Sequence, residues 1–194
     1  MSAGAGRQAR RGFSAGADRA TVVARAGEML LAGETVDVRR LAEECGVGRT
    51  TVYRWFGSRS GLLGEALWTL VDGAWSHARR TSPGTGPLHV REVVTTFLTS
   101  VRDSPPAASL MIDEPRLAVV SIMSPTGFVQ RRAVARTEQL LHDHSHLPED
   151  EVRPVAEIMT QVAMTYVWAQ LLTGASADLA TPLAIIDRLL RQTR

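Results

Sequence analysis

The chain has 194 residues, of which 44% are hydrophobic and 22% charged, so it is long enough to bury a core and has the composition of a globular protein. A single cysteine, Cys45, excludes an internal disulfide, and no apolar run reaches the length of a membrane span, so we expect a cytoplasmic protein. Residues 1–80 hold 12 Arg against 8 acidic residues (+4), and residues 81–194 hold 10 Arg against 12 (−2). Any contact with nucleic acid is therefore expected in the first part.

The N-terminal part is expected to begin with a disordered arm and to continue with short helices. Residues 1–13 are rich in Gly, Ala and Arg, which is typical of a disordered segment. Apolar residues at helical spacing predict a first helix over residues 18–32, and Gly33 ends it. Asp37 is a suitable N-cap for a second helix, and Ser58 for a longer one that links this part to the rest.

Residues 38–56 have the pattern of two short helices joined by a tight turn, a shape that fits a DNA major groove. Gly46 is suited to the left-handed conformation that follows the first of these helices. Val52 and Phe56 are four residues apart and are expected to face inward. The start of the second helix is then expected to reach base edges, while Tyr53, Arg54 and Trp55 are directed toward phosphates.

The remainder of the chain predicts further helices and no strand. Gly, Pro, Ser and Thr dominate residues 81–87, which predicts a loop. Apolar periodicity then predicts helices over 90–101, 126–142, 152–172 and 179–190. The expected fold is therefore all-α, with a helix-turn-helix domain over residues 14–61 and a helical ligand-binding and dimerisation domain over residues 62–194.

The helix-turn-helix segment resembles the DNA-binding domain of the TetR family of bacterial transcriptional regulators. The family pattern is roughly Thr-x-x-x-Ile-Ala-x-x-Ala-Gly-Val-Ser-x-x-Thr-Leu-Tyr-x-His-Phe-x-Ser-Lys-x-x-Leu. Residues 37–62 read Asp-Val-Arg-Arg-Leu-Ala-Glu-Glu-Cys-Gly-Val-Gly-Arg-Thr-Thr-Val-Tyr-Arg-Trp-Phe-Gly-Ser-Arg-Ser-Gly-Leu. A weaker resemblance, through residues 49–59, is to the QsdR-like subgroup. The family resemblance implies a cytoplasmic homodimer that binds a near-palindromic double-stranded operator as a repressor and releases it when a small, apolar effector binds.

The resemblance also indicates which residues contact DNA. Thr51 and Tyr53 match family DNA contacts, Trp55 stands where His is usual, and Arg59 stands where Lys is usual. Gly61 replaces a common Glu, so no capping box follows Ser58. The predicted DNA-binding residues are Arg39, Gly48, Arg49, Thr50, Thr51, Tyr53, Arg54, Trp55 and Arg59. For Tyr53 and Trp55 packing is the alternative role, and for Arg39 a solvated surface is. Gly48 replaces a capping Ser, which weakens the N-cap of the second helix.

Large apolar side chains in the C-terminal part are candidates for the effector cavity, although the same residues could build an ordinary core. They are Trp68, Phe97, Met111, Phe128, Met159, Met164 and Trp168, with Asp113 and Arg116 as polar anchors. The last two helices carry apolar stripes and are expected to form a four-helix bundle with a second copy. The predicted dimer contacts are Val155, Val162, Leu183, Ile186 and Leu190. Such a dimer would place two recognition helices roughly 34–36 Å apart.

Other functions are less well supported by the sequence. His142, His144 and His146 could hold a metal, but a polar turn explains them equally, and no fourth ligand is evident, so we expect neither a metal nor a cofactor. Cys45 occupies a small-residue position, and a redox role would need exposure and a lowered pKa. No catalytic constellation indicates an enzyme. An activator, or an architectural DNA-binding protein without an inducer, is the open alternative.

Overall fold

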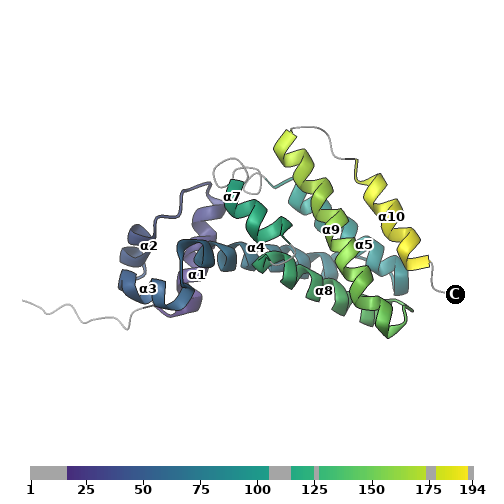
Figure 1. Ribbon diagram of the computed structural model, residues 1–194, viewed down its shortest axis with the longest axis horizontal. Coiled ribbons are helices and arrows are strands. Elements are labelled where there is room, and N and C mark those ends of the chain that lie inside the picture. Colours follow the sequence, from purple (N-terminus) through teal and green to yellow (C-terminus); the bar gives the residue numbers. More distant parts are fainter. Residues whose placement is uncertain (1–16, 105–114, 125–126, 174–177, 192–194) are drawn as a thin grey trace, which may run out of the picture.

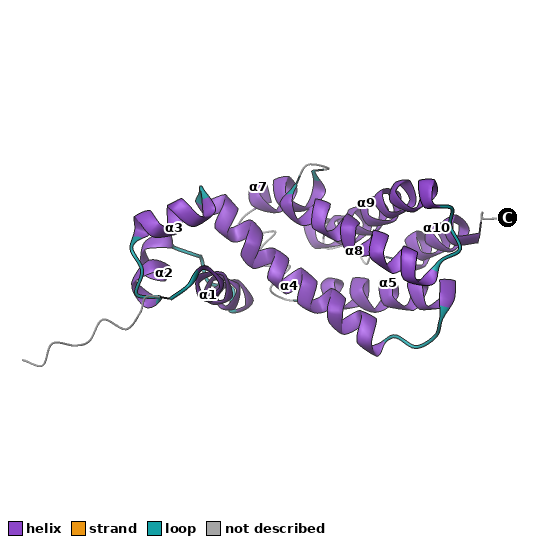
Figure 2. Ribbon diagram, turned by 90° about the horizontal axis from the view of Figure 1, so that it is seen from below, coloured by secondary structure: helices purple, strands orange, loops and turns teal. Residues whose placement is uncertain are grey.

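The computed structural model describes residues 17–104, 115–124, 127–173 and 178–191, and this part of the chain contains helices and connecting loops but no strand (Figures 1 and 2). The all-α fold is therefore confirmed. The proposed arm over residues 1–13 and the candidates Met111 and Asp113 lie outside the described residues, as does the side chain of Trp168. No described helix is long and apolar enough to cross a membrane.

Three short helices form a head at one end of the molecule (Figure 1). They are α1 (Arg19–Leu31), α2 (Val38–Glu44) and α3 (Arg49–Phe56). Asp18 caps α1 by accepting a hydrogen bond from the Thr21 backbone at 2.8 Å, and Asp37 caps α2 through the backbone of Arg40, also at 2.8 Å. Gly46 follows α2 with φ of +65°, as its position in the sequence predicts. Local sequence signals thus determine where each helix of the head begins and ends.

The long helix α4 (Arg59–Thr81) runs from the head into the body of the molecule (Figure 2). Ser58 caps it, and its hydroxyl accepts a hydrogen bond from the Gly61 backbone at 3.0 Å. A Cβ atom at Gly61 would lie 2.1 Å from the carbonyl oxygen of Phe56, so the first turn of α4 packs directly against the end of α3. This contact explains why Glu, common at this position in the family pattern, is replaced by Gly here.

The remaining helices pack around the far part of α4. They are α5 (Gly86–Arg102), α7 (Pro115–Ala118), the π-helical turn η1 (Val119–Met123), α8 (Phe128–His144), α9 (Glu149–Thr173) and α10 (Ala180–Arg191). The loop predicted over residues 81–87 lies between α4 and α5 as expected, although α5 already begins at Gly86. Helix α8 continues to His144, two residues beyond its predicted end, because the His142 segment completes a further helical turn. Buried Val90, Leu98 and Leu140 contribute to the core between these helices.

The predicted dimer contacts are mostly buried within the chain itself, and their role in a dimer stays a prediction. Leu183, Ile186 and Leu190 form the inner stripe of α10 and are buried in the core of the same chain, as Val155 is on α9. These residues of α10 lie on the side of the helix that packs on α5 and α9 of the same chain. Val162 is half-buried and follows the exposed Ile158 by one turn on the outer side of α9.

Candidate nucleic-acid interface and effector cavity

Helix α3 separates a buried stripe from an exposed polar surface, as a recognition helix must. Val52 and Phe56 are buried against the head core, 1% and 8% exposed. Gly48, Arg49, Thr50, Tyr53 and Arg54 are exposed, while Thr51 is half-buried. Gly48 is the N-cap of α3 and supplies no side-chain hydrogen bond, so the cap is weak, as predicted from the missing Ser. The polar surface of α3 therefore has the shape and polarity to enter a groove.

Ion pairing within the head distinguishes the arginines of α3 from their neighbours. On α2, Arg39 pairs with Glu43 at 3.0 Å, and Arg40 pairs with Glu44 at 2.7 Å and with Glu34 at 2.8 Å. The two arginines that hold Glu44, Arg25 first, lower the pKa of that carboxyl group. On these elements most positive charge is therefore already compensated within the protein.

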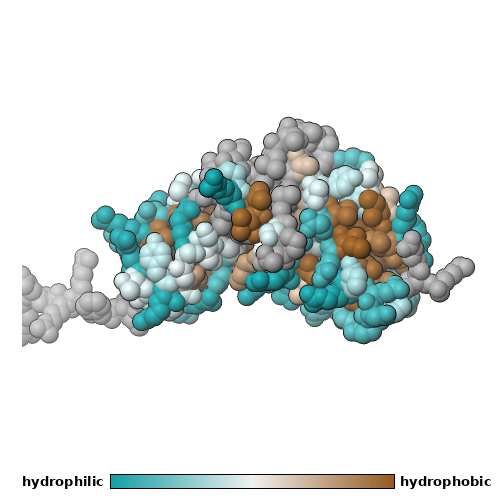
Figure 3. All heavy atoms as spheres, viewed as in Figure 1, coloured by the Kyte–Doolittle hydropathy of each residue, from teal (hydrophilic) through white to brown (hydrophobic). Residues whose placement is uncertain are grey.

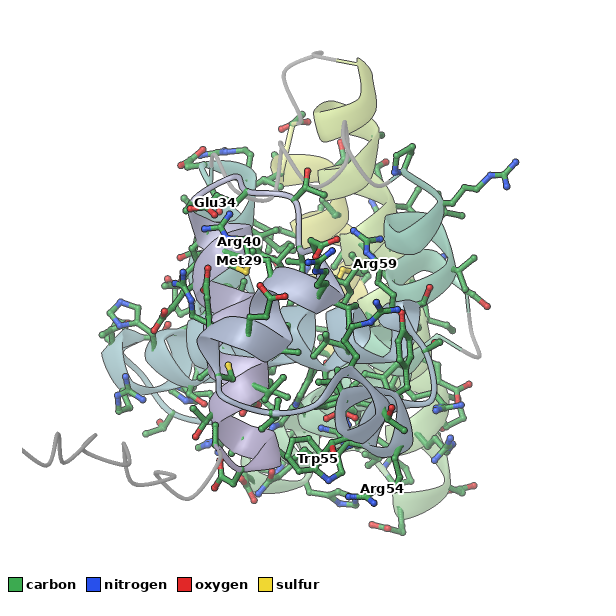
Figure 4. All side chains as sticks on the ribbon, turned by 90° about the vertical axis from the view of Figure 1, so that its left-hand side faces the viewer. Met29, Glu34, Arg40, Arg54, Trp55 and Arg59 are labelled. Carbon is green, nitrogen blue, oxygen red and sulfur yellow. The ribbon has the colours of Figure 1, made fainter. Side chains whose placement is uncertain are left out.

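The arginines of α3 have no such compensation. Among the described residues, Arg54 has no hydrogen bond or ion pair, and Arg49 has only the distant attraction of Asp37, which helps to lower the pKa of that aspartate. Figure 4 shows Arg40 beside Glu34 on one side of the head, with Arg54 and Trp55 at the opposite edge. Uncompensated positive charge on an exposed helix is an electrostatic match for phosphates.

Arg59 makes a contact within the head that its position in the motif did not predict. Its Nε donates a hydrogen bond at 3.0 Å to the backbone carbonyl of Val36, just before α2, and the side chain is half-buried. The guanidinium thus ties the start of α4 to the α1–α2 connection. A phosphate contact by Arg59 stays a prediction. In the structure, Arg59 stabilises the head through its hydrogen bond to Val36.

Trp55 also has a structural role. It is half-buried, and its ring lies edge-to-face with Phe56 at 6.3 Å between centroids. The guanidinium of Arg19 lies over the ring of Phe56, 4.9 Å from its centre. Of the two aromatic candidates, Tyr53 is the one that projects into solvent, with 41% of its surface exposed.

Cys45 is a partly buried residue at the end of α2, packed against the head core. Burial raises the pKa of its thiol, with a further increase from Glu44. A raised pKa keeps the sulfur protonated and weakly nucleophilic, which favours the packing role over a redox role.

Four of the candidate effector residues line one small cavity between α4, α5, α8 and α9. Trp68, Phe97, Met159 and Met164 are in its wall, and its volume is about 30 Å³. Phe128 is not in this wall but lies beside Gly64 of α4, where a Cβ atom added to the glycine would come within 3.8 Å of it, and Arg132 lies over its ring. Arg116 is exposed on α7, away from the residues that line the cavity.

The sequence did not single out the polar residues of this wall. They are Trp75, Arg136, Thr137 and Thr160. Arg136 reaches across from α8 and holds Asp72 of α4 with two hydrogen bonds, of 2.7 and 3.1 Å. The pairing of Arg136 with Asp72 could not be predicted, because periodicity locates a face but not a partner on another helix.

A second, larger cavity of about 390 Å³ lies next to the first. Both cavities share Val71, Phe97 and Met164 in their walls, so these side chains separate them. The larger cavity also touches Leu30 and Leu31 at the end of α1. It therefore joins the interior of the body to the head.

The histidines at the end of α8 do not gather into a metal site. His142 lies 3.3 Å from Glu149, whereas His144 lies against His89 of α5, with 4.4 Å between ring centroids and 55° between the ring planes. Burial, and then the neighbouring His89, lower the pKa of His144. The described part of the chain contains no cluster of three or more metal-ligating side chains.

Comparison with known proteins agrees with this arrangement of head and body. The model of bacterial regulatory proteins of the tetR family matches residues 30–66, and the model of the tetracyclin repressor-like C-terminal domain matches residues 85–191. No curated protein matches the chain.

Two solved structures cover nearly the whole chain. One is the transcriptional repressor QsdR from R. erythropolis, with 29% identity, a TM-score of 0.82, and 91% of this chain and 95% of that one covered. The other is the repressor AlkX from Dietzia sp. strain DQ12-45-1b, implicated in biodegradation of n-alkanes, with 21% identity, a TM-score of 0.68, and 92% and 98% covered. The second likeness concerns the fold alone. One family model matches residues 30–66, and the other matches residues 85–191, which is more than half of the chain. This protein therefore belongs to the TetR family of bacterial regulatory proteins.

Proposed function

We propose that the protein is a homodimeric transcriptional repressor that binds a near-palindromic operator and releases it when a small, apolar effector enters the body. It acts as a regulator and not as an enzyme. The observation that carries the DNA contact is the exposed polar surface of α3, where Arg54 is uncompensated although the arginines of α2 are paired. The likeness to QsdR, itself a transcriptional repressor, supports repression over activation.

Dimerisation through α9 and α10 is supported by the apolar side chains that these helices expose on the side facing away from the core. Ile158 is 48% exposed, and Val162 and Tyr166 follow it at intervals of four residues, both half-buried. On α10, Ile185 and Leu189 are partly exposed and also four residues apart. Figure 3 shows hydrophobic residues gathered on the surface at the end of the molecule formed by α5, α9 and α10. A second copy would cover these side chains in an isologous contact.

Release of DNA follows from the position of α4. This helix begins beside α3, where Arg59 and Gly61 contact the rest of the head, and it ends in the wall of the cavities. An effector that separates α4 from α5 or α8 would turn the heads of the dimer and change the spacing of the two recognition helices. The affinity difference expected from such coupling is about 1–3 kcal/mol.

The test is binding of the purified protein to the DNA upstream of its own coding sequence, measured by fluorescence anisotropy at several salt concentrations. For Arg54→Ala we expect weaker binding and a salt dependence that falls by about one ion per head, because one phosphate contact is lost. Tyr53→Phe removes only a hydroxyl group and should weaken binding by about 1.5–3 kcal/mol if that group contacts a phosphate.

The matched control is Arg102→Ala, which removes the same charge from the end of α5, where Arg102 pairs with Asp103. This variant should bind DNA as the wild type does. Equal binding by Arg54→Ala, Tyr53→Phe and the control would contradict the proposed interface.

A further inference from the structure

Trp75 presents a buried hydrogen-bond donor that has no acceptor. It lies on α4 with 7% of its surface exposed, and it lines the 30 Å³ cavity. Its ring packs edge-to-face against Phe97, with 5.2 Å between centroids. Among the described residues nothing accepts a hydrogen bond from its Nε1. An unpaired buried donor costs about 1–3 kcal/mol, and folded proteins rarely leave one without a partner.

The hydroxyl and guanidinium groups of this cavity are already engaged, and the Nε1 of Trp68, the other indole of the wall, is not among the fully buried atoms that lack a partner. The hydroxyl of Thr137 donates to the carbonyl of Ala133 at 3.0 Å. Because a hydroxyl has a single proton, Thr160 is then the donor in the 3.2 Å contact between the two threonines. The charge of Arg136 is compensated by Asp72, which accepts two hydrogen bonds from it. Trp75 is thus the one buried donor of the described cavity wall that still lacks an acceptor.

We propose that Trp75 is the recognition residue of the effector site, and that its Nε1–H donates to the carbonyl oxygen of an uncharged, otherwise apolar molecule such as a long-chain ketone or ester. This inference rests on the proposed function, in which the cavity takes an effector. A pure hydrocarbon would leave the indole donor unpaired. A carboxylate would enter an apolar cavity whose arginine already holds a carboxylate, and would lose its hydration without gaining a counter-charge.

The two cavities define how such a molecule lies. A volume of about 30 Å³ has room for little more than a water molecule, so a carbonyl group with its flanking carbons fits beside Trp75 only when Phe97 moves. An apolar tail must pass Phe97 and Met164 into the 390 Å³ cavity, whose wall includes Leu30 and Leu31 of α1. The occupant therefore displaces Phe97, contacts α4 at its polar end and reaches the head at its apolar end. Helix α4 thus carries the residue that recognises the effector and also leads to the head that releases DNA.

The experiment uses full-length protein with ¹⁵N-labelled tryptophan, in which each of the four tryptophans gives one indole N–H signal. Trp75→Phe removes one signal and so assigns it. If that variant does not fold, the phenylalanine variants of the other three tryptophans assign it by elimination. The probes are 2-decanone and ethyl octanoate, with n-decane and decanoate as molecules of similar length that lack a neutral carbonyl group.

The expected result is a downfield shift of the Trp75 indole proton with 2-decanone or ethyl octanoate, and no such shift with n-decane or decanoate. The wild type should bind 2-decanone about tenfold more tightly than n-decane, and Trp75→Phe should lose this preference. Arg102→Ala, which changes a residue outside both cavity walls, should retain it. The proposal is overturned if neither carbonyl probe shifts the Trp75 signal, or if Trp75→Phe keeps the preference.

Operator binding is measured on the same samples by anisotropy, first without any probe. Failure to bind DNA without a probe would contradict the proposed repressor while leaving the indole shift as an independent result. DNA binding that is normal and an indole that does not respond would contradict the recognition role of Trp75 alone.

Discussion

At the scale of single residues, backbone geometry explains a departure from the family pattern that side-chain chemistry does not. Gly61 lies where a Cβ atom would come within 2.1 Å of the Phe56 carbonyl, and a backbone atom cannot move aside cheaply. A Cβ atom at Gly73, farther along α4, would have no neighbouring atom within 4 Å. Of these two glycines of α4, Gly61 is thus required by a close contact, whereas no neighbouring atom requires a glycine at position 73.

Gly61→Ala should therefore destabilise the head, by about 1–3 kcal/mol, because α3 and the start of α4 must separate to relieve the overlap. Urea unfolding followed by circular dichroism, at one fixed protein concentration, measures this loss. Gly73→Ala is the matched control and should stabilise the protein by about 0.5–1 kcal/mol, since Ala is the better helix former. Equal stability of the two variants would show that the close contact of Gly61 does not exist.

At the scale of elements, α4 is held to the body by polar as well as apolar contacts. Arg136 of α8 holds Asp72 with both a 2.7 Å and a 3.1 Å hydrogen bond, a bidentate geometry that fixes one helix against the other. The two side chains are 40% and 28% exposed, so water reduces the strength of this pair. The pair connects the wall of the effector cavity to the helix that carries the head.

A double-mutant cycle with Asp72→Asn and Arg136→Gln should give a coupling energy of about 0.5–1 kcal/mol in thermal or urea unfolding. The comparison is the pair of Arg153 and Glu157, which lies on one exposed face of α9 at 3.1 Å and should give about 0.3–0.5 kcal/mol. A coupling of zero between Asp72 and Arg136 would mean that the packing of α4 and α8 alone sets their relative position.

At the scale of the whole molecule, the arrangement of apolar residues supports a position for the second copy of the proposed homodimer. The inner stripes of α9 and α10 are used within the chain, and Ile158 is left 48% exposed on the outer side of α9. With half-buried Val162 and Tyr166 at intervals of four residues, Ile158 belongs to a continuous apolar strip on one side of α9, which supports this side as the contact in the proposed dimer.

Ile158→Glu should shift the protein from dimer to monomer in sedimentation equilibrium, because a carboxylate in an isologous contact is buried twice. Val120→Glu is the matched control, since Val120 is 64% exposed and belongs to η1 and not to α9 or α10. Loss of the dimer in both variants would point to general unfolding, and an intact dimer in Ile158→Glu would exclude this face.

The sequence by itself determined the local structure of the head. Asp18, Asp37, Gly46 and Ser58 act through their own backbone neighbourhoods, so caps and turns follow from residues a few positions apart. The same holds for the inward spacing of Val52 and Phe56. These local signals also carried the family resemblance, which is why fold and family were both predicted correctly.

The tertiary structure decided everything that depends on which helix faces which. Periodicity gave Leu183, Ile186 and Leu190 a common face, but only the packing of α10 on its own chain showed that this face is already buried. In the same way, the hydrogen bond from Arg59 to Val36 and the ion pair of Arg136 with Asp72 join residues far apart in sequence. The unpaired Nε1 of Trp75 follows from its surroundings alone. Contacts between distant segments arise from side chains of several helices meeting in space, and no spacing along a single helix contains that information.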